Sequence, residues 1–324
     1  MKTFHIFILL LSLISFLSAE KCHPNDKKAL LKIKNDLNNP YDIITWDPKT
    51  DCCEDWYAVQ CDPKTNRTTQ LNIHNADIKR PIPASIAELT YLESLSFHSC
   101  NMTGHITEAI AKLSNLNFID LRHNHLTGPV PSFLGQLKKL EYIGLSFNNL
   151  TGSIPASLSM LTKLGGLLLD RNQLTGTIPE SFGSFKEDFY LYLSHNQLSG
   201  PIPKTLANAN FNYIDASRNK LEGDISFLFG IKSLNYIDFS RNMLQFDFSK
   251  VVEFTSTLAH LDLNHNRIYG SIPQALAKLD YVALDVSYNR LCGKIPVGAG
   301  LQKQDVARFL HNKCLCGAPL PKCK

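Results

Sequence analysis

The sequence lacks most features that mark an enzyme or a nucleic-acid-binding protein. Its formal net charge is only +4 over 324 residues, and it has no compact run of Lys and Arg. A nucleic-acid partner is therefore not expected. It contains neither a Gly-x-Ser-x-Gly motif nor a His-Glu-x-x-His motif, which would place a nucleophile or a catalytic metal. We predict a binding protein without catalytic activity, cofactor or metal.

Long hydrophobic runs are scarce, and the one that stands out lies at the N-terminus. It covers residues 6–17, follows Lys2 and is succeeded by Ala19. A basic start, a short apolar run and a small residue before the cleavage point are typical of a secretory signal peptide, and the run is shorter than the ~20 residues that cross a bilayer. We predict a signal peptide at residues 1–19 and a secreted chain without a transmembrane anchor. Candidate glycosylation sequons stand at Asn66, Asn101 and Asn149.

Cysteine is nearly absent from the middle of the chain. Four cysteines precede residue 62, four follow residue 291, and only Cys100 lies between the two groups. Neither group has the paired Cys-x2-Cys spacing of zinc sites, and export favours oxidation. We predict disulfides at the two ends, although the residues by themselves leave the pairing open. The cysteines concerned are Cys22, Cys52, Cys53, Cys61, Cys292, Cys314, Cys316 and Cys323.

An internal repeat, by contrast, fills most of the sequence. The pattern Leu-x-x-Leu-x-Leu-x-x-Asn-x-Leu-x-Gly-x-Ile-Pro recurs ten times at intervals of 24 or 23 residues. Repetition at this period is the signature of leucine-rich repeats. The predicted fold class is an α/β repeat solenoid, a right-handed leucine-rich-repeat superhelix with a concave parallel β-sheet and disulfide-bonded caps. The Asn position of the pattern holds Ala76, Cys100, Asn124, Asn148, Asn172, Asn196, Asn219, Asn242, Asn266 and Asn289.

A single copy of the repeat explains why the copies stack. Ile119 and Leu121 are two residues apart on a short strand, so they point inward together while their neighbours point outward. The Asn turns the chain inward, where its amide can satisfy backbone groups, and Gly128 permits the next turn. One copy cannot bury its apolar face, but stacked copies form a continuous core. Cys100 stands at an Asn position and is interpreted as a buried thiol rather than a reactive one.

Both ends of such an array expose apolar surface and need caps. Residues 20–65 are predicted as an N-terminal cysteine-rich cap, in which Asn25 starts a helix and the two tryptophans cover the end of the core. The ten repeats occupy residues 66–297. Residues 298–324 are predicted as a C-terminal cysteine-rich cap.

Several segments resemble plant extracellular leucine-rich-repeat proteins. The plant-type turn is seen in Thr151-Gly152-Ser153-Ile154-Pro155, and the segment Cys52-Cys53 with Trp56 resembles the plant N-terminal cap. Near the C-terminus, Asn289-Arg290-Leu291-Cys292-Gly293 and His311-Asn312-Lys313-Cys314-Leu315-Cys316-Gly317 are similar to segments of polygalacturonase-inhibiting proteins. The resemblance covers essentially the whole mature chain. It implies the disulfides Cys22–Cys52, Cys53–Cys61, Cys292–Cys314 and Cys316–Cys323.

The same resemblance implies a function and a binding face. The chain would be a monomeric plant defence protein of the cell wall that binds and inhibits fungal, and also insect, polygalacturonases and that attaches to pectin. Exposed residues of the concave strands would contact the enzyme, and here they are Asp120, Arg122, His123, Tyr142, Asp170, Arg171, Tyr190, Tyr192, Asp215, Arg218, Asn235, Tyr236, Asp238 and Arg241. A basic column beside the Asn positions would bind pectin, and here it holds Arg171, His195, Arg218 and Arg241. The family's usual Asp of the central strands is replaced by Gly144, Leu168 and Tyr192.

Two other functions fit the same fold. One is a receptor-associated adaptor in signalling or development, because a fold does not determine function. The other is an ice-binding array, since regular repeats offer a periodic surface. The Tyr and Arg residues on the expected face favour a protein interface over a merely solvated sheet.

Histidine adds a prediction about pH. Six histidines are placed at outward positions of the strands and turns: His74, His98, His123, His195, His260 and His265. An unperturbed His titrates near ~6.5, so a mildly acidic wall compartment would charge many of them. We predict that acid strengthens attachment to anionic pectin.

Overall fold

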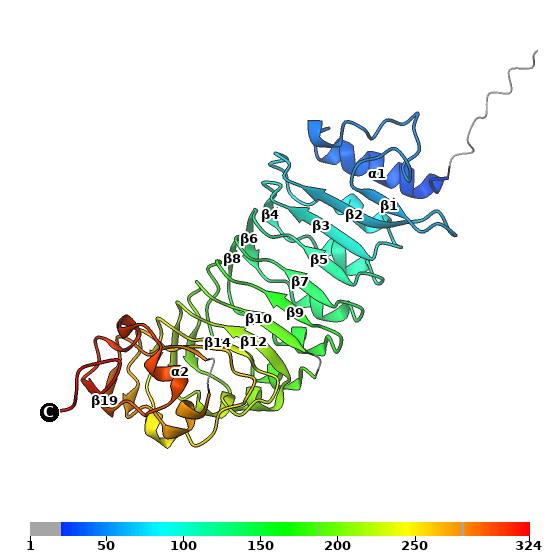
Figure 1. Ribbon diagram of the computed structural model, residues 1–324. Coiled ribbons are helices and arrows are strands. Elements are labelled where there is room, and N and C mark those ends of the chain that lie inside the picture. The colour runs from blue at the N-terminus through cyan, green and yellow to red at the C-terminus, as the bar shows by residue number, and fades with distance from the viewer. Residues whose placement is uncertain (1–20, 187, 280–281) are drawn as a thin grey trace, which may run out of the picture.

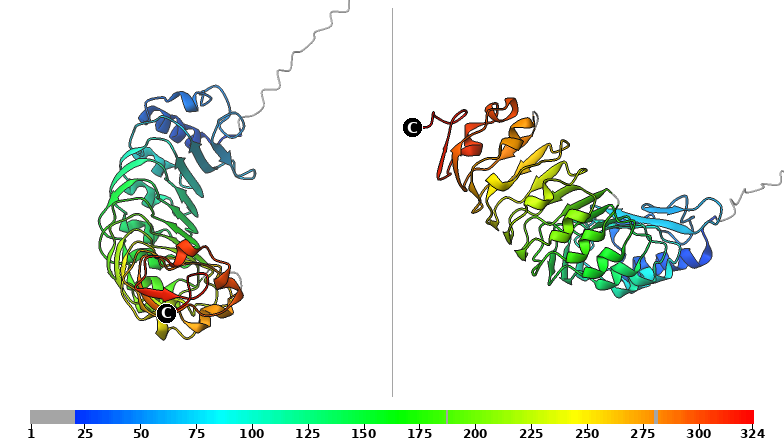
Figure 2. Two further views of the ribbon diagram at one scale, coloured as in Figure 1. Left: turned by 60° about the vertical axis from the view of Figure 1, so that its left-hand side comes forward. Right: turned by 90° about the horizontal axis from the view of Figure 1, so that it is seen from below.

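The computed structural model describes residues 21–186, 188–279 and 282–324. The predicted signal peptide, residues 1–19, lies outside the described residues. The chain forms a curved array in which successive repeats contribute strands to one sheet of eleven strands (Figure 1). The sheet lines the inner side of the curve and short helices line the outer side (Figure 2). None of the described helices is long and apolar enough to cross a membrane.

The large sheet follows the order of the chain. β1 pairs antiparallel with β2, and each later strand pairs parallel with the next. This is the concave parallel sheet that the repeat pattern predicts, with one antiparallel strand added by the N-terminal cap. Its strands are β1 (Val59–Cys61), β2 (Thr68–His74), β3 (Ser94–His98), β5 (Phe118–Asp120), β7 (Tyr142–Gly144), β9 (Gly166–Leu168), β10 (Phe189–Tyr192), β12 (Phe211–Asp215), β14 (Tyr236–Asp238), β16 (His260–Asp262) and β18 (Ala283–Asp285).

The core runs along the whole array because the repeats are in register. Ile119 of β5 lies opposite Ile143 of β7, which in turn lies opposite Leu167 of β9, and all three are fully buried. Burial of each such side chain contributes about 1.5–3 kcal/mol relative to exposure. Stacking therefore supplies the apolar burial that one repeat cannot supply alone.

The Asn of each repeat joins its turn to the turn before it. The Oδ1 atom of Asn148 accepts a hydrogen bond from the backbone N–H of Leu126 at 3.0 Å. Its Nδ2 atom donates to the carbonyl oxygens of Leu121 and Leu145 at 2.9 and 3.0 Å. Buried backbone groups that lie outside the sheet are thereby paired, as burial requires. The same bonds recur in the later repeats, for example at Asn242.

The remaining elements complete each coil of the chain. Small parallel sheets flank the main one, formed by β4 (Thr103–His105), β6 (His125–Pro129) and β8 (Asn149–Thr151), by β11 (Ser199–Pro201), β13 (Lys220–Gly223) and β15 (Met243–Leu244), and by β17 (Tyr269–Gly270), β19 (Arg290–Lys294) and β20 (Cys314–Cys316). The convex side carries the 3-10 helices η2 (Ala84–Glu88), η3 (Glu108–Lys112), η4 (Ser132–Gln136), η5 (Ala156–Met160), η6 (Glu180–Ser184), η7 (Lys204–Asn208), η8 (Ser226–Leu228), η9 (Phe248–Lys250) and η10 (Gln274–Lys278). The Pro of the Ile-Pro motif directly precedes six of these helices, where its fixed φ suits the start of a helix.

The N-terminal cap covers the first repeat with a helix and two indole rings. The helix α1 (Pro24–Asp36) begins one residue before the predicted Asn25, because Pro24 fits the first helical turn. A short 3-10 helix, η1 (Tyr41–Ile43), follows it. Trp46 and Trp56 are buried and stacked, with ring centroids 5.5 Å apart.

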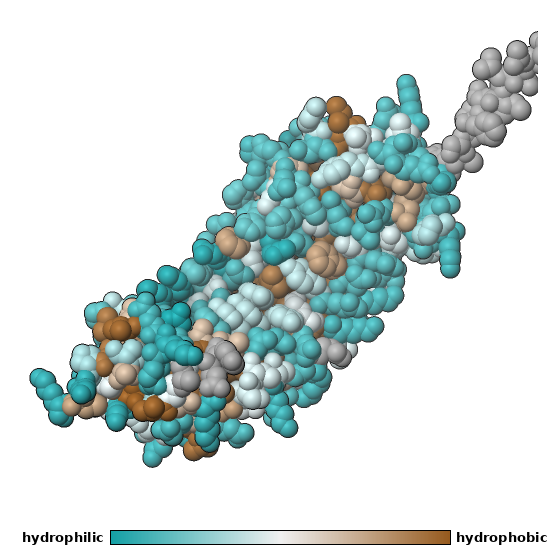
Figure 3. Space-filling view, in the orientation of Figure 1, coloured by the Kyte–Doolittle hydropathy of each residue, from teal (hydrophilic) through white to brown (hydrophobic). Residues whose placement is uncertain are grey.

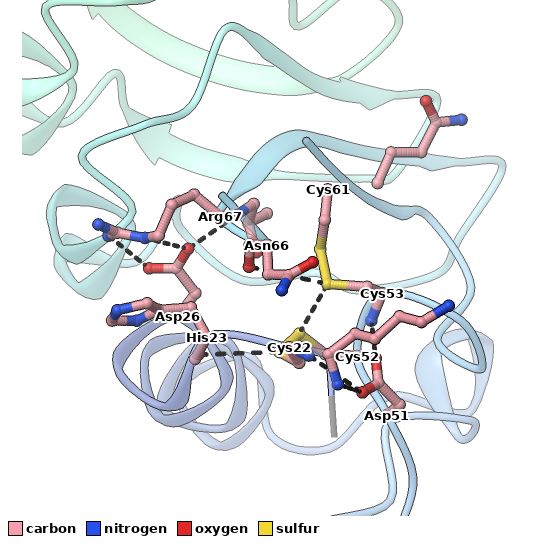
Figure 4. The surroundings of a disulfide bond; sticks show 12 residues. Cys22, His23, Asp26, Asp51, Cys52, Cys53, Cys61, Asn66 and Arg67 are labelled. Atoms are coloured by element: carbon pink, nitrogen blue, oxygen red, sulfur yellow. Dashed lines mark hydrogen bonds and ion pairs between the residues drawn. A yellow bond between two sulfur atoms is a disulfide. The ribbon is translucent and has the colours of Figure 1, made fainter. Parts of the chain in front are cut away.

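A buried ion pair and two disulfides hold this cap together (Figure 4). The carboxylate of Asp26 accepts hydrogen bonds from the Arg67 guanidinium at 2.8 and 2.9 Å and from the backbone N–H of Thr68 at 2.7 Å. Disulfides join Cys22–Cys52, Cys53–Cys61, Cys292–Cys314 and Cys316–Cys323, which are the four pairs that the resemblance implies.

The C-terminal segment continues the repeat architecture further than its sequence suggests. It contains α2 (Ala299–Gln302), η11 (Val306–Phe309) and β20. Asn312 stands 23 residues after Asn289 and makes the same bonds: it accepts from the N–H of Leu291 at 3.0 Å and donates to the carbonyl oxygens of Val286 and Phe309. An eleventh repeat turn, the ninth with Asn at this position, therefore lies within the segment predicted as a cap.

Candidate partner-binding face

The concave sheet presents three outward positions per repeat. Each short strand has one inward residue between two outward residues. The outward residues before it form the first row, and those after it form the acid row. The residues directly before the Asn position of each repeat form a third set, the turn column. The first row holds Phe118, Tyr142, Gly166, Tyr190, Tyr213, Tyr236, His260 and Ala283. The acid row holds Asp120, Gly144, Leu168, Tyr192, Asp215, Asp238, Asp262 and Asp285.

The structure places the predicted partner-binding residues on this one face. The first row contains Tyr142, Tyr190 and Tyr236, and Asn235 directly precedes Tyr236. The acid row contains Asp120, Tyr192, Asp215 and Asp238. The turn column contains His123, Arg171, Arg218 and Arg241, and Arg122 and Asp170 each stand one residue before a member of it. Tyr288 also belongs to the turn column. It is not among the contact residues that the resemblance implies, although its place directly before Asn289 identifies it as a member of the column.

Aromatic rings stack along the C-terminal part of the face. Tyr192, Tyr213, Tyr236 and His260 form a continuous series with centroid separations of 4.4, 4.0 and 4.2 Å. The parallel strands set this spacing, because neighbouring strands in a sheet lie about 4.8 Å apart. The stack is rigid and half-exposed, which suits a contact surface for another protein.

Asp120 departs from the prediction that it is exposed. The residue is only 5% exposed, and its carboxylate accepts hydrogen bonds from Arg122 Nε and Nη2 at 2.9 and 2.8 Å. His98 Nδ1 lies 3.3 Å away on its other side. The neighbouring Gly144 leaves the room, since a Cβ atom there would lie 3.0 Å from Asp120 and 3.2 Å from Arg122. The pair is thus closed within the sheet, and Asp120 is not free to meet a partner.

The acids at the two ends of the row have different electrostatic surroundings. Burial disfavours the charged form of Asp120, but the hydrogen bonds from Arg122 outweigh it and hold its pKa below the usual value. Burial raises the pKa of Asp238, and it raises the pKa of Asp262 to about 7. Asp262 has only the amide groups of Asn264 as hydrogen-bond donors among the bonds described.

The turn column has an unusual backbone. From His123 to Tyr288 its residues adopt φ values between +52° and +56°, a left-handed conformation uncommon outside glycine. This conformation reverses the chain into the Asn turn and projects each side chain along one edge of the face. The Arg171 guanidinium lies 5.0 Å above the Phe147 ring, and His123 stacks on the other side of that ring at 4.1 Å.

The pKa values of four histidines on the face differ from the unperturbed value used in the sequence-based prediction. Burial lowers the pKa of His123, His195, His260 and His265. Protonation of these four rings therefore needs a more acidic solution than the ~6.5 expected of a free His. The positive charge that these histidines add to the concave face is therefore gained at a lower pH than the sequence predicts.

The remaining candidate sites have structural explanations. The thiol of Cys100 is buried, donates to the carbonyl oxygens of Ile73 and His98 at 3.2 and 3.3 Å, and has its pKa raised by burial to about 11. That environment disfavours a reactive thiolate. Among the described residues, the one group close enough to hold a metal consists of Cys22, Cys52 and Cys53, which are in disulfides.

The three sequons differ in accessibility. Asn149 is exposed at the start of β8, whereas the Asn101 side chain donates to Asp77 at 2.8 Å. Asn66 lies in the turn between β1 and β2, and Thr68 of its sequon is fully buried. Asn149 is thus the most accessible of the three in the folded chain.

The fold, the caps and the concave face define a leucine-rich-repeat protein. The Leucine rich repeat N-terminal domain matches residues 23–62, and the Leucine Rich Repeat matches residues 115–137, 139–161, 163–185, 189–209 and 257–279. A solved plant ice-binding protein is 50% identical, superimposes with a TM-score of 0.91, and the match covers 94% of this chain and 99% of that one.

Two curated relatives identify the family more closely. Polygalacturonase inhibitor 2 of Arabidopsis thaliana is 56% identical over 100% of this chain and 99% of its own length. Polygalacturonase inhibitor of Vitis vinifera is 51% identical over the full length of both chains. The chain belongs to the polygalacturonase-inhibitor family, a group of plant leucine-rich-repeat defence proteins that are inhibitors and not enzymes.

Proposed function

We propose that this protein is secreted to the cell wall, where as a monomer it binds and inhibits fungal polygalacturonases. The observation that carries the proposal is family membership over the full chain, combined with a broad aromatic and charged concave face. Inhibition occurs by occlusion of the substrate cleft, through an interface of ordinary size, about 1,600 Å² in total. Insect polygalacturonases are a second target class for the same face.

The proposed contact centres on exposed and half-buried members of the predicted set. Tyr190, Tyr192, Tyr236 and Asp215 combine rigid aromatic area with an unpaired acid, the type of residue set that forms interface hot spots. The Asp215 carboxylate accepts only from the N–H and hydroxyl of Ser217 among the bonds described, so its charge remains available.

A charge reversal tests this contact. Asp215→Lys is expected to raise the inhibition constant about tenfold, because hot-spot substitutions cost more than 1 kcal/mol. The matched control is Glu253→Lys, which reverses an exposed acid outside the concave sheet. The measurement is an inhibition panel across several purified polygalacturonases, with thermal melting of each variant. Unchanged inhibition by a folded Asp215→Lys would exclude this residue, and capture of a plant receptor ectodomain instead of the enzyme would favour the adaptor function.

Pectin attachment belongs to the turn column. Arg171, Arg218 and Arg241 are exposed and follow one another along one edge of the face, with His195 among them. A row of cations at the regular spacing of the repeats suits a polyanion such as polygalacturonate. Retention on immobilised polygalacturonate should fall when the three Arg residues are replaced by Gln, and it should fall further as salt is added.

Ice binding is the second candidate function. It is supported by the similarity to the solved plant ice-binding protein and by a regular column of hydroxyls on the flank of the array. The column comprises Thr103, Thr127, Thr151 and Thr175, which occupy equivalent positions in successive repeats. Thermal hysteresis of the purified protein tests this function independently of enzyme inhibition.

A further inference from the structure

The ring series on the concave face is interrupted at its centre. Phe118 and Tyr142 stack at 4.7 Å, but the next residue in the first row is Gly166, which has no ring to continue the series. The row resumes with Tyr190 on β10. β9, which carries Gly166, is the sixth of the eleven strands, so the interruption lies midway along the sheet.

An open hollow of about 350 Å³ lies beside the gap in the ring series. It is lined by Tyr142 of β7, by Tyr190 and Tyr192 of β10, and by Leu168, Gly165 and Gly166 between them. We call it the tyrosine slot. A Cβ atom on Gly166 would lie 3.1 Å from Tyr142 Cδ2, so the ring of Tyr142 rests directly against the glycine backbone. The centre of the face in Figure 3 accordingly shows pale and brown surface between teal margins.

The rim of the slot is acidic. Glu141 and Asp188 complete its lining, and both are exposed. The same two acids also line an adjoining polar groove together with Lys163 and Lys186. Lys186 Nζ donates to the carbonyl oxygen of Asn208 at 2.9 Å, and Asn210 Nδ2 donates to Asp188 at 2.9 Å. The two carboxylates at the slot itself disfavour a uronic acid and favour an apolar group that is accompanied by a cation.

The tyrosine slot has both the lining and the central position that an interface anchor requires. Anchors are aromatic side chains that enter desolvated pockets near the centre of an interface. The slot has apolar walls, flat rings on both sides and a central place in the sheet. We propose that the tyrosine slot binds one aromatic side chain of the polygalacturonase, next to a Lys or Arg that faces Glu141 and Asp188. This inference rests on the proposed function and names the chemistry that decides which enzymes are bound.

The test fills the slot without disturbing the repeat. In Gly165→Leu the new Cβ atom would meet only the backbone oxygens of Asp188 and Glu141, at 3.6 and 3.9 Å, which are ordinary contact distances. The matched control is Gly230→Leu, where a Cβ atom meets nothing within 4 Å and which follows η8 outside the concave sheet. Both variants and the wild type are compared for melting temperature, inhibition of a polygalacturonase panel and retention on polygalacturonate.

The expected result separates the slot from the rest of the face. Gly165→Leu should raise the inhibition constant about tenfold or more for enzymes that the wild type inhibits, whereas Gly230→Leu should change it less than about twofold. Retention on polygalacturonate should be unchanged in both. Unchanged inhibition by a folded Gly165→Leu would overturn the slot and leave the proposed function intact.

Three other outcomes are also decisive. Loss of polygalacturonate retention with full inhibition would show a sugar in the slot and overturn the proposal. A wild type that inhibits no enzyme of the panel would overturn the proposed function and the slot together. If Gly165→Leu does not fold, Leu168→Ala replaces it, since it only shortens a half-buried side chain; a loss of inhibition of about tenfold supports the slot and no loss overturns it.

Discussion

The N-terminal and C-terminal halves of the concave face use the same strand position in different ways. In the N-terminal half the acid is Asp120, which is paired with Arg122 and His98 and is buried. In the C-terminal half the position holds Asp215, Asp238, Asp262 and Asp285, and the residue two positions on is Ser or Asn instead of Arg. Neutral donors hold these carboxylates, so no cation neutralises them as Arg122 neutralises Asp120, while burial keeps Asp262 protonated up to a pH of about 7. One scaffold thus carries a neutralised half and an acidic half, and the difference depends on one outward residue per repeat.

Removal of the cation from the N-terminal half should have the largest effect on stability. Arg122→Ala leaves the Asp120 carboxylate buried, with only the His98 ring beside it. Loss of one partner from a buried pair costs several kcal/mol, and because Arg122 is partly exposed we expect about 2 kcal/mol in the free energy of unfolding. Urea denaturation at pH 7 measures it. The double variant Asp120→Asn/Arg122→Ala should recover most of the loss, and equal stability of Arg122→Ala and wild type would remove the distinction between the two halves.

Removal of an acid from the C-terminal half should stabilise the protein, whereas Arg122→Ala destabilises it. The change in the free energy of unfolding should be smaller and should depend on pH. Because burial raises the pKa of Asp262 to about 7, the folded chain holds a proton that the unfolded chain releases above about pH 4. This contribution to stability is complete in acid and is lost as the pH rises through about 7. Asp262→Asn should therefore be more stable than wild type by about 1–2 kcal/mol at pH 8 and equal to it at pH 4.

Asp120→Asn is the matched control for that experiment. Its pKa is held below the usual value, so its contribution is present above about pH 4 and is lost as the solution becomes more acidic. Asp120→Asn should therefore destabilise the protein at pH 8, in the opposite direction to Asp262→Asn. The same sign in both variants would contradict the contrast between the halves.

Replacement of the histidines in the turn column should give the smallest effect, a change in the pH dependence of retention on polygalacturonate. Retention on polygalacturonate at low salt should rise by about twofold between pH 7.5 and pH 5, because the lowered pKa values of His123, His195 and His265 leave only part of the rings protonated. The triple variant with Gln at these three positions should lose that rise. Full pH dependence in the triple variant would assign it to other groups.

The repeat register could be predicted because it is a property of spacing. Apolar pairs such as Ile119 and Leu121 and the Asn at regular intervals define which residues point inward, so the sheet and the outward rows follow. The sequence pattern does not reveal Asn312 as a repeat position, because the cysteines of the C-terminal segment interrupt the apolar pattern around it. Its hydrogen bonds show that a degenerate turn keeps the Asn when the surrounding residues change.

The burial of Asp120 and the tyrosine slot could not be predicted from one repeat at a time. Each depends on side chains that three neighbouring strands bring together. Gly144 reads as a missing Asp in its own repeat, yet in the structure it makes room for the Asp120–Arg122 pair from the strand before it. Gly166 similarly gives Tyr142 a backbone surface to rest on. Comparison of equivalent positions on neighbouring strands is the step that would predict these two contacts.

The left-handed backbone of the turn column limits how this protein family can evolve. β-branched side chains are strongly disfavoured at positive φ, so Val, Ile and Thr are poor substitutes at these positions. The column accordingly contains only His, Phe, Arg and Tyr from His123 to Tyr288. Diversification of this edge is therefore restricted to a reduced set of amino acids, and in this chain that set is rich in cations and rings. We expect paralogues to differ here by exchange among those residues, while the first row and the acid row are free of this backbone restriction.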